Sequence, residues 1–383
     1  MHKTSIFYTR IFTVLSFLLF PIIYFLILLR KRKTGDDVKV LVIPQLTRVG
    51  DIVCSTPVFQ AIKEKYPKSR VVVLVSLKAS GIIKNNPRID EIINIEDYKG
   101  NFFGLMKKIL DERFDFGVSL SGTAFSSTLF FYGFIPNRIK ITRPDGPWSE
   151  VFTDWMSNFK YEYKNLSYLP AFYLKLLEPL NIYKKEVKKE VFWSKVSDNN
   201  IDLFFQQNNI TSQDKIVGVS LTAGNKIKEW GDEKFTVLVR EIVARFGMKI
   251  IFIGGPGDKD RVQKVIDSLV DKNNYINSVG ISLEDLPALM NRFNFFISVD
   301  TGPTHIAESL GVPLIDILGP VNDIELTPRG KHSRIIKADG VEPTVFAFQP
   351  SGEPNLIKKS LDDISASKVL SIFDNLYNEV VKN

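Results

Sequence analysis

Short apolar runs alternate along this chain with longer segments whose apolar residues recur every three or four positions. Alternation of that kind is typical of strands and helices that build parallel α/β sheets. It occurs in both halves of the chain, so the pattern predicts two α/β domains in tandem. The expected strands are 38–43, 70–75, 91–95 and 114–119 in the first half, and 216–221, 248–253, 295–299 and an apolar strand after Gly311 in the second.

Changes in composition suggest where these domains begin and end. A lysine-rich stretch at 184–190 separates the two series of strands and helices. We therefore expect a first domain over 36–190 and a second over 191–360. The final segment, 361–383, has apolar residues at helical spacing and predicts an amphipathic helix.

Residues 11–29 form an uncharged, largely apolar run. As a helix rising ~1.5 Å per residue, the run would span roughly 28 Å, close to the thickness of the hydrocarbon core of a bilayer. The basic cluster Arg30–Lys33 outweighs Lys3 and Arg10 on the other flank, which favours large domains on the cytoplasmic side. It also replaces the small residues of a signal-peptide cleavage site. Because Pro21 interrupts the run, a helix lying in the membrane interface is the alternative to a transmembrane helix.

The net charge of +7 belongs almost wholly to this N-terminal segment. Residues 1–35 contain six Lys or Arg and no acid, which leaves a net charge of +1 for the rest of the chain. No basic patch interleaved with aromatic residues recurs, so nucleic acid is disfavoured as a partner. The single cysteine, Cys54, excludes intramolecular disulfides, and three histidines allow no ordinary zinc site.

The strongest functional signal is the turn that starts at Asp300, where an apolar strand ends and a helix begins. Pro303 suits the first helical turn, and Gly302 lets a ligand approach the backbone. Free N–H groups and the positive end of the helix dipole favour an anion there, and His305 adds a possible donor. The structural alternative is that Asp300 caps the helix and His305 is a satisfied histidine. An aspartic protease is excluded because the chain has one Asp-Thr-Gly and that triplet opens a helix.

A second candidate turn is Thr47-Arg-Val-Gly-Asp51, after the first strand. Gly50 is expected to permit an unusual turn, with Asp51 at the start of the helix. There Asp51 either caps the helix or accepts a proton from a hydroxyl nucleophile.

Two further turns belong to the second domain. Lys226 and Lys228 precede Trp230 and are suited to a departing diphosphate, although solvated lysines beside a packed tryptophan are the alternative. Gly254 and Gly255 lead to Asp258, which suits a ribose hydroxyl or simple capping. The turn does not match the Gly-x-Gly-x-x-Gly fingerprint, and an isolated Asp-x-Asp is too weak to assign a metal.

In this order and spacing, the Val-Gly-Asp-x5-Pro core, the Lys-x-Trp turn, the Gly-Gly-Pro turn and the Asp-Thr-Gly-Pro-x-His helix resemble glycosyltransferase family 9. That is the family of ADP-heptose:lipopolysaccharide heptosyltransferases. The resemblance covers roughly residues 38–380.

The resemblance implies a GT-B fold: two Rossmann-like, doubly wound domains facing a cleft, here preceded by the transmembrane helix. It implies that the acceptor binds the first domain, that the nucleotide-sugar binds the second, and that the helix in 361–383 packs back on the first. The implied reaction is inverting, needs no metal or cofactor, and moves a heptose to a membrane-linked glycan such as lipopolysaccharide core. The implied location is the cytoplasmic face of the bacterial inner membrane.

By position, Asp51 matches the family's general base, and Lys228 matches its phosphate-contacting catalytic lysine. Thr47, Arg48 and Gly50 form the acceptor-side loop. The implied donor-binding residues are Thr222, Lys228, Gly254, Gly255, Asp258, Asp300, Thr301, Gly302, Pro303 and His305.

Two alternatives remain open from the sequence. One is a nucleotide-sugar epimerase of similar build, and the other is a membrane-tethered protein that binds a nucleotide or glycan without catalysis. An NAD-dependent oxidoreductase is disfavoured because the first strand leads into Pro-Gln-Leu-Thr-Arg rather than a glycine fingerprint.

Overall fold

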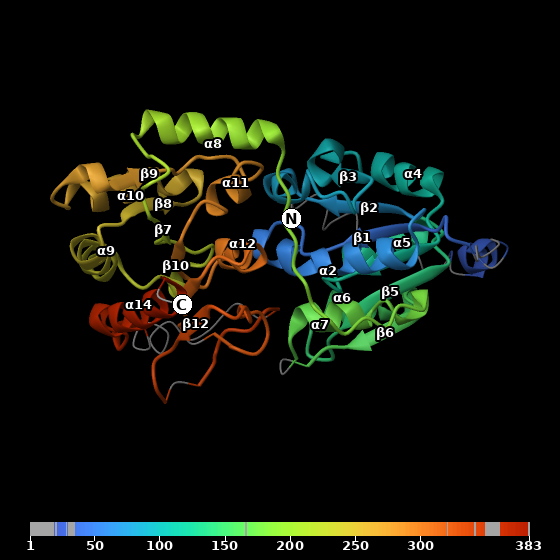
Figure 1. Ribbon diagram of the computed structural model, residues 1–383. Coiled ribbons are helices and arrows are strands. Elements are labelled where there is room, and N and C mark those ends of the chain that lie inside the picture. The colour runs from blue at the N-terminus through green and yellow to red at the C-terminus, as the bar shows by residue number, and fades with distance from the viewer. Residues whose placement is uncertain are drawn as a thin grey trace. The chain divides into compact units, whose positions relative to one another are not determined.

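The computed structural model describes residues 19, 21–27, 29, 35–164, 167–319, 321–340, 342–348 and 361–381. The chain forms two compact units that divide between Lys188 and Lys189, two residues from the boundary expected from the sequence. Each unit contains one six-stranded parallel sheet with helices around it (Figure 1).

The sheet of the first unit has the strand order β3-β2-β1-β4-β5-β6. Its central strands are almost wholly buried, as expected for a parallel sheet covered by helices on both faces. The strands are β1 (Lys39–Ile43), β2 (Arg70–Val75), β3 (Glu91–Asn94), β4 (Phe116–Ser119), β5 (Asn137–Thr142) and β6 (Phe159–Glu162). The helices are α2 (Val49–Lys65), α3 (Leu77–Ser80), α4 (Phe102–Glu112), α5 (Ala124–Tyr132), α6 (Trp148–Phe152) and α7 (Leu169–Lys175).

Strands β5 and β6 were not expected from the sequence. In β5, two buried cations interrupt the apolar pattern: Arg138 donates to backbone carbonyls, including that of Met156, and Lys140 pairs with Asp154 at 2.8 Å. Strand β6 is only partly buried and alternates with exposed positions. A search for apolar runs therefore passes over both strands.

The sheet of the second unit has the equivalent order, β9-β8-β7-β10-β11-β12. In both units the order reverses beside the first strand, so the β1/β4 and β7/β10 pairs are the switch points where such sheets bind ligands. The strands are β7 (Ile216–Ser220), β8 (Lys249–Ile253), β9 (Tyr275–Asn277), β10 (Phe295–Val299), β11 (Leu314–Ile317) and β12 (Ser333–Ile336). The helices are α8 (Lys195–Gln207), α9 (Asp232–Phe246), α10 (Lys259–Asp267), α11 (Leu286–Met290), α12 (Gly302–Leu310) and α14 (Ala366–Val381).

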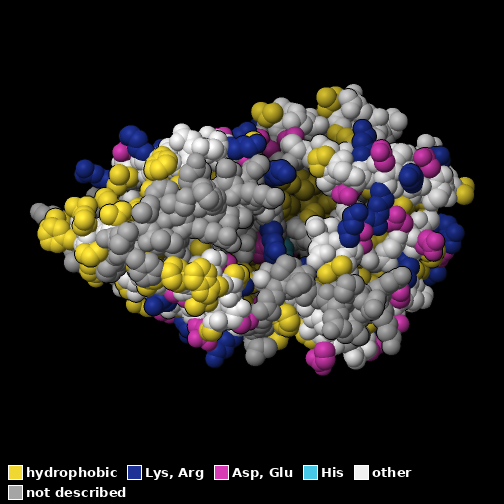
Figure 2. Space-filling view, turned by 180° about the vertical axis from the view of Figure 1, so that it is seen from behind, with side chains coloured by type: hydrophobic (Ala, Val, Ile, Leu, Met, Phe, Trp, Pro, Cys, Tyr) yellow, Lys and Arg dark blue, Asp and Glu magenta, His cyan; other side chains and the backbone are white. Residues whose placement is uncertain are grey.

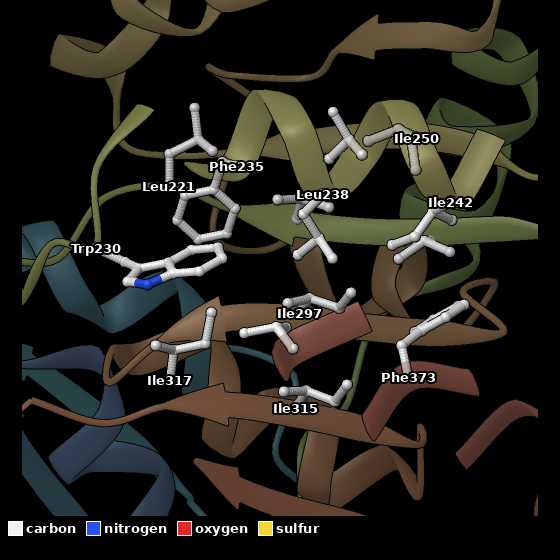
Figure 3. Close-up of a cluster of buried hydrophobic side chains, with 14 of the residues drawn as sticks. Leu221, Trp230, Phe235, Leu238, Ile242, Ile250, Ile297, Ile315, Ile317 and Phe373 are labelled. Atoms are coloured by element: carbon white, nitrogen blue, oxygen red, sulfur yellow. The ribbon is translucent and has the colours of Figure 1, made fainter. Parts of the chain in front are cut away.

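Helix α14 packs on the second unit, and its packing on the first unit stays a prediction. Its buried face joins the core between α9 and the sheet, where Figure 3 shows Phe373 near Ile242 and Ile315. The Phe373 ring centroid lies 5.2 Å from that of Phe246 and 5.1 Å from that of Phe295. The apolar face of this helix is thus already satisfied within its own unit.

Most of the predicted membrane helix, 11–29, lies outside the described residues. Its described part is helical over 21–27, and Ile23 and Ile27 are buried in the core of the first unit. No helix among the described residues is both long and apolar enough to cross a membrane. The structure therefore does not support a transmembrane helix here, because two of its side chains are used in protein packing instead of facing lipid.

Candidate functional site

Asp51 is placed differently from the sequence expectation. Helix α2 begins at Val49, so Gly50 lies inside the helix and does not have the positive φ of an unusual turn. The N-cap residue is Arg48, which makes no side-chain cap, and Thr47 lies exposed in the preceding turn. Asp51 is therefore not the N-cap. Its carboxylate is only 7% exposed, with Oδ2 lying 3.9 Å from Nη1 of Arg48.

A tyrosine that the sequence did not single out lies close to this carboxylate. Tyr173 is fully buried on α7, which packs against α2. Its hydroxyl has no hydrogen-bond partner within the described residues. Burial raises the pKa of Tyr173 well above its usual value, and the negative charge of Asp51 raises it further. The phenol is therefore neutral, and it lies within electrostatic reach of Asp51. No sequence pattern links two residues this far apart.

In the second unit, one hydrogen-bond network joins the turns that follow β7 and β8. Oγ1 of Thr222 donates to Oδ2 of Asp258 at 2.9 Å, and the N–H of Gly255 donates to the same oxygen at 2.8 Å. A Cβ on Gly254 would lie 3.0 Å from that oxygen, so the backbone approaches Asp258 closely. The structure thus brings four predicted donor-binding residues together, with Asp258 in the capping role.

The Asp300 turn has the predicted form. Pro303 lies in the first turn of α12, which directly follows the end of β10. The N-cap residue is Thr301, without a side-chain cap, so Asp300 does not cap the helix. Instead Asp300 accepts a hydrogen bond from Nζ of Lys228 at 2.5 Å. The lysine of the Lys-x-Trp turn and the Asp300 turn therefore form one site, at the carboxyl ends of β7 and β10.

The charge on Asp300 is fixed by this pairing. Burial alone would raise the pKa of Asp300, but the charge and hydrogen bond of Lys228 outweigh burial and lower it. Asp300 is therefore a carboxylate at neutral pH and balances the ammonium of Lys228. An ammonium carries three donors, so Lys228 can hold Asp300 and still bind a phosphate oxygen.

His305, one turn into α12, is almost fully buried in a second charged cluster. Nδ1 lies 3.2 Å from Nζ of Lys189, and Lys189 also forms an ion pair with Glu308. Burial and the neighbouring Lys189 charge lower the pKa of His305, so the imidazole is neutral at neutral pH. Lys189 was not identified as a site residue from the sequence, because the lysine-rich stretch around it was interpreted as a domain boundary.

Glu308 connects this cluster to the next loop. It accepts a hydrogen bond from the backbone N–H of Arg329 at 2.6 Å. Burial would raise the pKa of Glu308, but the nearby imidazole of His305 and the charge and hydrogen bond of Lys189 lower it to about 2. Glu308 is therefore ionised at neutral pH, and its ion pair with Lys189 balances that charge on the buried side of α12.

Asp316 is a third acid at this site, and the sequence analysis missed it. It lies in β11 opposite Ser298 of β10 and is fully buried. Neither carboxyl oxygen has a hydrogen-bond partner among the described residues. Burial raises the pKa of Asp316 well above its usual value, and the Asp300 charge adds to this. A single acid inside the apolar run 312–318 was the available signal.

A cavity of about 700 Å³, lined largely by charged residues, opens beside the turns after β7 and β8. Ligands of open α/β sheets bind in this region, at the carboxyl ends of adjacent strands. Arg261 in its wall is already paired with Glu229 and Asp232. Trp230 is a core residue and donates to the carbonyl of Ile364 at 2.8 Å. The cavity is lined by Ala223, Gly224, Lys226, Glu229, Asp232, Gly257, Asp258, Asp260, Arg261 and Lys264.

Comparison with known proteins agrees with this geometry. Residues 102–346, more than half of the chain, match the family described as glycosyltransferase family 9 (heptosyltransferase). Lipopolysaccharide heptosyltransferase 3 of Escherichia coli is 25% identical over 296 residues, which cover 73% of this chain and 83% of that protein. Lipopolysaccharide heptosyltransferase 1 of Campylobacter coli is 25% identical over 293 residues, covering 73% and 83%.

Solved structures show the same fold. A family 9 glycosyltransferase from Veillonella parvula superposes with a TM-score of 0.76 at 21% identity, over 91% of this chain and all of that one. The E. coli ADP-heptose lipopolysaccharide heptosyltransferase II superposes with a TM-score of 0.71 at 18% identity, over 89% and 99%. The two six-stranded sheets are thus those of GT-B heptosyltransferase structures. The chain belongs to glycosyltransferase family 9, the heptosyltransferase family, and is a glycosyltransferase.

Proposed function

We propose that this protein transfers a heptose from ADP-heptose to a membrane-linked glycan acceptor such as lipopolysaccharide core, with inversion and without a metal or cofactor. The observation that carries the proposal is the pairing of Lys228 with Asp300 at the N-terminus of α12. It supplies an ammonium and free backbone N–H groups where a sugar diphosphate would bind. The names of several relatives support the heptose and the lipopolysaccharide acceptor.

On the donor side, Lys228 and the N-terminal turn of α12 would stabilise the diphosphate as it gains charge on leaving. Thr301, Gly302 and Pro303 form that turn, and neutral His305 lies one turn further along the helix. The turn containing Thr222, Gly254, Gly255 and Asp258 would hold the ribose side of the nucleotide. The second unit would then determine which nucleotide-sugar the protein binds.

On the acceptor side, Asp51 would take the proton of the attacking hydroxyl. The hydroxyl oxygen would form a bond to the anomeric carbon while the bond between that carbon and the diphosphate oxygen breaks. Attack on the face opposite the leaving group gives inversion. The exposed residues Thr47 and Arg48 precede Asp51 in the acceptor-side loop, and we place the reaction at the cytoplasmic face of the bacterial inner membrane.

The proposal is tested by thermal unfolding of the full chain with a panel of nucleotides and nucleotide-sugars. A ligand that binds only the folded protein raises the apparent melting temperature. We expect ADP and ADP-heptose to raise it, and uridine and guanosine derivatives to leave it unchanged. A response confined to uridine or guanosine derivatives would contradict the donor assignment.

Transfer is then measured with ADP-heptose and heptose-deficient lipopolysaccharide as the acceptor, followed by mass spectrometry and NMR spectroscopy of the glycan. We expect an added heptose and the opposite anomeric configuration. A matched reaction without acceptor serves as control, because an isomerised sugar formed there would indicate an epimerase. Binding without turnover on any acceptor would indicate a non-catalytic binding protein.

A further inference from the structure

The described part of the N-terminal helix has two apolar faces, one buried in protein and one exposed. Ile23 and Ile27, one helical turn apart, are 5% exposed and pack with Phe102 and Phe125 in the core of the first unit. The described side chains of the other face are exposed. We call it the apolar ridge; its side chains are between 40% (Leu19) and 63% (Leu29) exposed, and its members are Leu19, Ile22, Phe25, Leu26 and Leu29.

The ridge is a continuous surface. Positions 19, 22, 26 and 29 recur every three or four residues, so their side chains share one side of the helix, and Phe25 lies beside them. Figure 2 shows hydrophobic side chains gathered at the end of the first unit where the dark blue helix of Figure 1 lies. Single exposed apolar residues are ordinary, but a row of five large ones marks an interaction surface.

The charges next to the ridge indicate what it contacts. Arg30, Lys31, Arg32 and Lys33 follow it directly in the sequence, and residues 1–35 contain no acid. An apolar helix face that includes Phe and Leu, with a basic cluster beside it, suits an anionic lipid surface. The aromatic Tyr24 is also exposed on the same helix, as interfacial helices favour.

We propose that this helix lies in the plane of an anionic bilayer, with the ridge inserted at the level of the acyl chains. Ile23 and Ile27, on the opposite face of the helix, pack in the core of the first unit and so attach that unit to the helix. A helix with protein on one side and lipid on the other cannot be surrounded by lipid, so the in-plane arrangement replaces a membrane crossing by this segment. The inference concerns membrane attachment alone and does not depend on the transfer reaction.

The test is flotation of the full chain with vesicles of phosphatidylcholine and phosphatidylglycerol in a 7:3 ratio. The test variant is Ile22→Ser/Phe25→Ser/Leu29→Ser. The matched control is Leu77→Ser/Leu203→Ser/Val270→Ser, which removes three apolar side chains from elsewhere that are 54% to 83% exposed. Melting temperatures measured without lipid establish that both variants are folded.

We expect the native chain and the control to float with the vesicles, and the ridge variant to lose roughly tenfold or more of its partitioning. High salt should weaken binding because the basic cluster acts electrostatically. Equal flotation of the ridge variant and the control would overturn the proposal, as would failure of the native chain to float. So would a dimer of the native chain, in the absence of lipid, that only the ridge variant dissociates.

A second measurement separates the in-plane helix from a crossing one. Phe25→Trp adds an indole at the ridge, and its fluorescence is read as the difference from the native chain in vesicles with brominated lipids. We expect stronger quenching by bromines near the headgroups than by bromines near the bilayer centre. The reverse order would exclude the in-plane arrangement.

Discussion

Asp51 and Asp300 each lie near the start of a helix that follows a central strand, yet their surroundings differ. Asp300 precedes its helix and is held by Lys228 at 2.5 Å, so its charge is fully balanced. Asp51 lies inside the first turn of α2, where Nη1 of the half-exposed Arg48 is 3.9 Å from its Oδ2. A carboxylate that is paired with an ammonium has a lowered pKa and is a poor base, but it can hold the lysine in position. The comparison therefore supports the proposal that the Asp300 turn binds the donor and that Asp51 takes the proton.

The largest expected effect comes from Asp51→Asn. If Asp51 is the general base, this change lowers kcat by about 10²- to 10⁴-fold, because the amide cannot accept the proton. The affinity for ADP should stay unchanged, since Asp51 belongs to the other unit. Steady-state kinetics and calorimetric titration with ADP measure the two quantities. A loss of ADP affinity instead would remove the distinction between the two aspartates.

Lys228→Met should lower the affinity for ADP, the quantity that Asp51→Asn leaves unchanged. Removing the ammonium leaves the Asp300 carboxylate beside the diphosphate, so ADP affinity should fall by roughly 10- to 100-fold, the range of one charged hydrogen bond. The double variant Lys228→Met/Asp300→Asn separates binding from folding. It should recover the melting temperature of the native chain without recovering ADP affinity. Recovery of both would mean that Lys228 serves only to balance Asp300.

Glu308→Gln tests the charged cluster behind α12 through the pH dependence of stability. The folded-state pKa of about 2 lies below the unfolded value, so the stabilisation is fully present above about pH 4.3 and is lost as the pH falls toward 2. At pH 7 the variant should lose on the order of 2–3 kcal/mol in urea unfolding, and the difference should shrink at pH 3. Glu186→Gln, at an exposed position, is the control and should show no such change.

Asp316→Asn should have a smaller effect of opposite sign. The raised folded-state pKa of Asp316 means that its contribution is most favourable below the unfolded value near pH 3.9 and decreases as the pH rises from there. The asparagine variant does not titrate, so it should equal or exceed the stability of the native chain at pH 8, by about 1 kcal/mol or more. Asp339→Asn, at a fully exposed acid, provides the control. If the variant, measured against the native chain, is less stable at pH 8 than at pH 5, the raised pKa of Asp316 is contradicted.

Tyr173→Phe should have the smallest effect and sharpens the description of Asp51. Removing a buried hydroxyl that has no hydrogen-bond partner in the described part of the chain should leave unfolding stability unchanged or raise it by up to about 1 kcal/mol. Transfer should keep more than a tenth of its rate if the phenol only lies near the base. A larger rate loss with an altered pH profile would show that Tyr173 donates to Asp51 during turnover.

Local patterns predicted the parts of this molecule that depend on local chemistry. The strand, turn and helix around Asp300 and Pro303 depend on residues that are consecutive in the sequence, and so does the Lys-x-Trp turn. The sequence did not predict that Lys228 reaches Asp300 or that Lys189 reaches His305, because each pair is formed by the tertiary fold. Interpreting Gly50 as a turn residue was wrong because α2 starts two residues earlier than expected.

Long-range packing also limited the larger-scale predictions. An apolar run indicates that a segment avoids water, but it does not indicate whether protein or lipid surrounds the segment. The run 11–29 was interpreted as a membrane helix, whereas Ile23 and Ile27 are covered by protein. The amphipathic pattern of α14 was correct, and the helix packs in the core of its own unit. In β5, the buried Arg138 and Lys140 hid a strand that only their tertiary partners make possible.

The pairing of Lys228 with Asp300 has a consequence for selectivity. A lysine standing alone in a crevice attracts any small anion from solution, including free phosphate. Here the resident carboxylate acts as an internal counter-ion, so the empty crevice offers little net attraction. A ligand must also reach the N–H groups of α12 to compete with Asp300 for the ammonium. The site would therefore remain unoccupied among abundant inorganic anions and would fill with a diphosphate that makes both contacts at once.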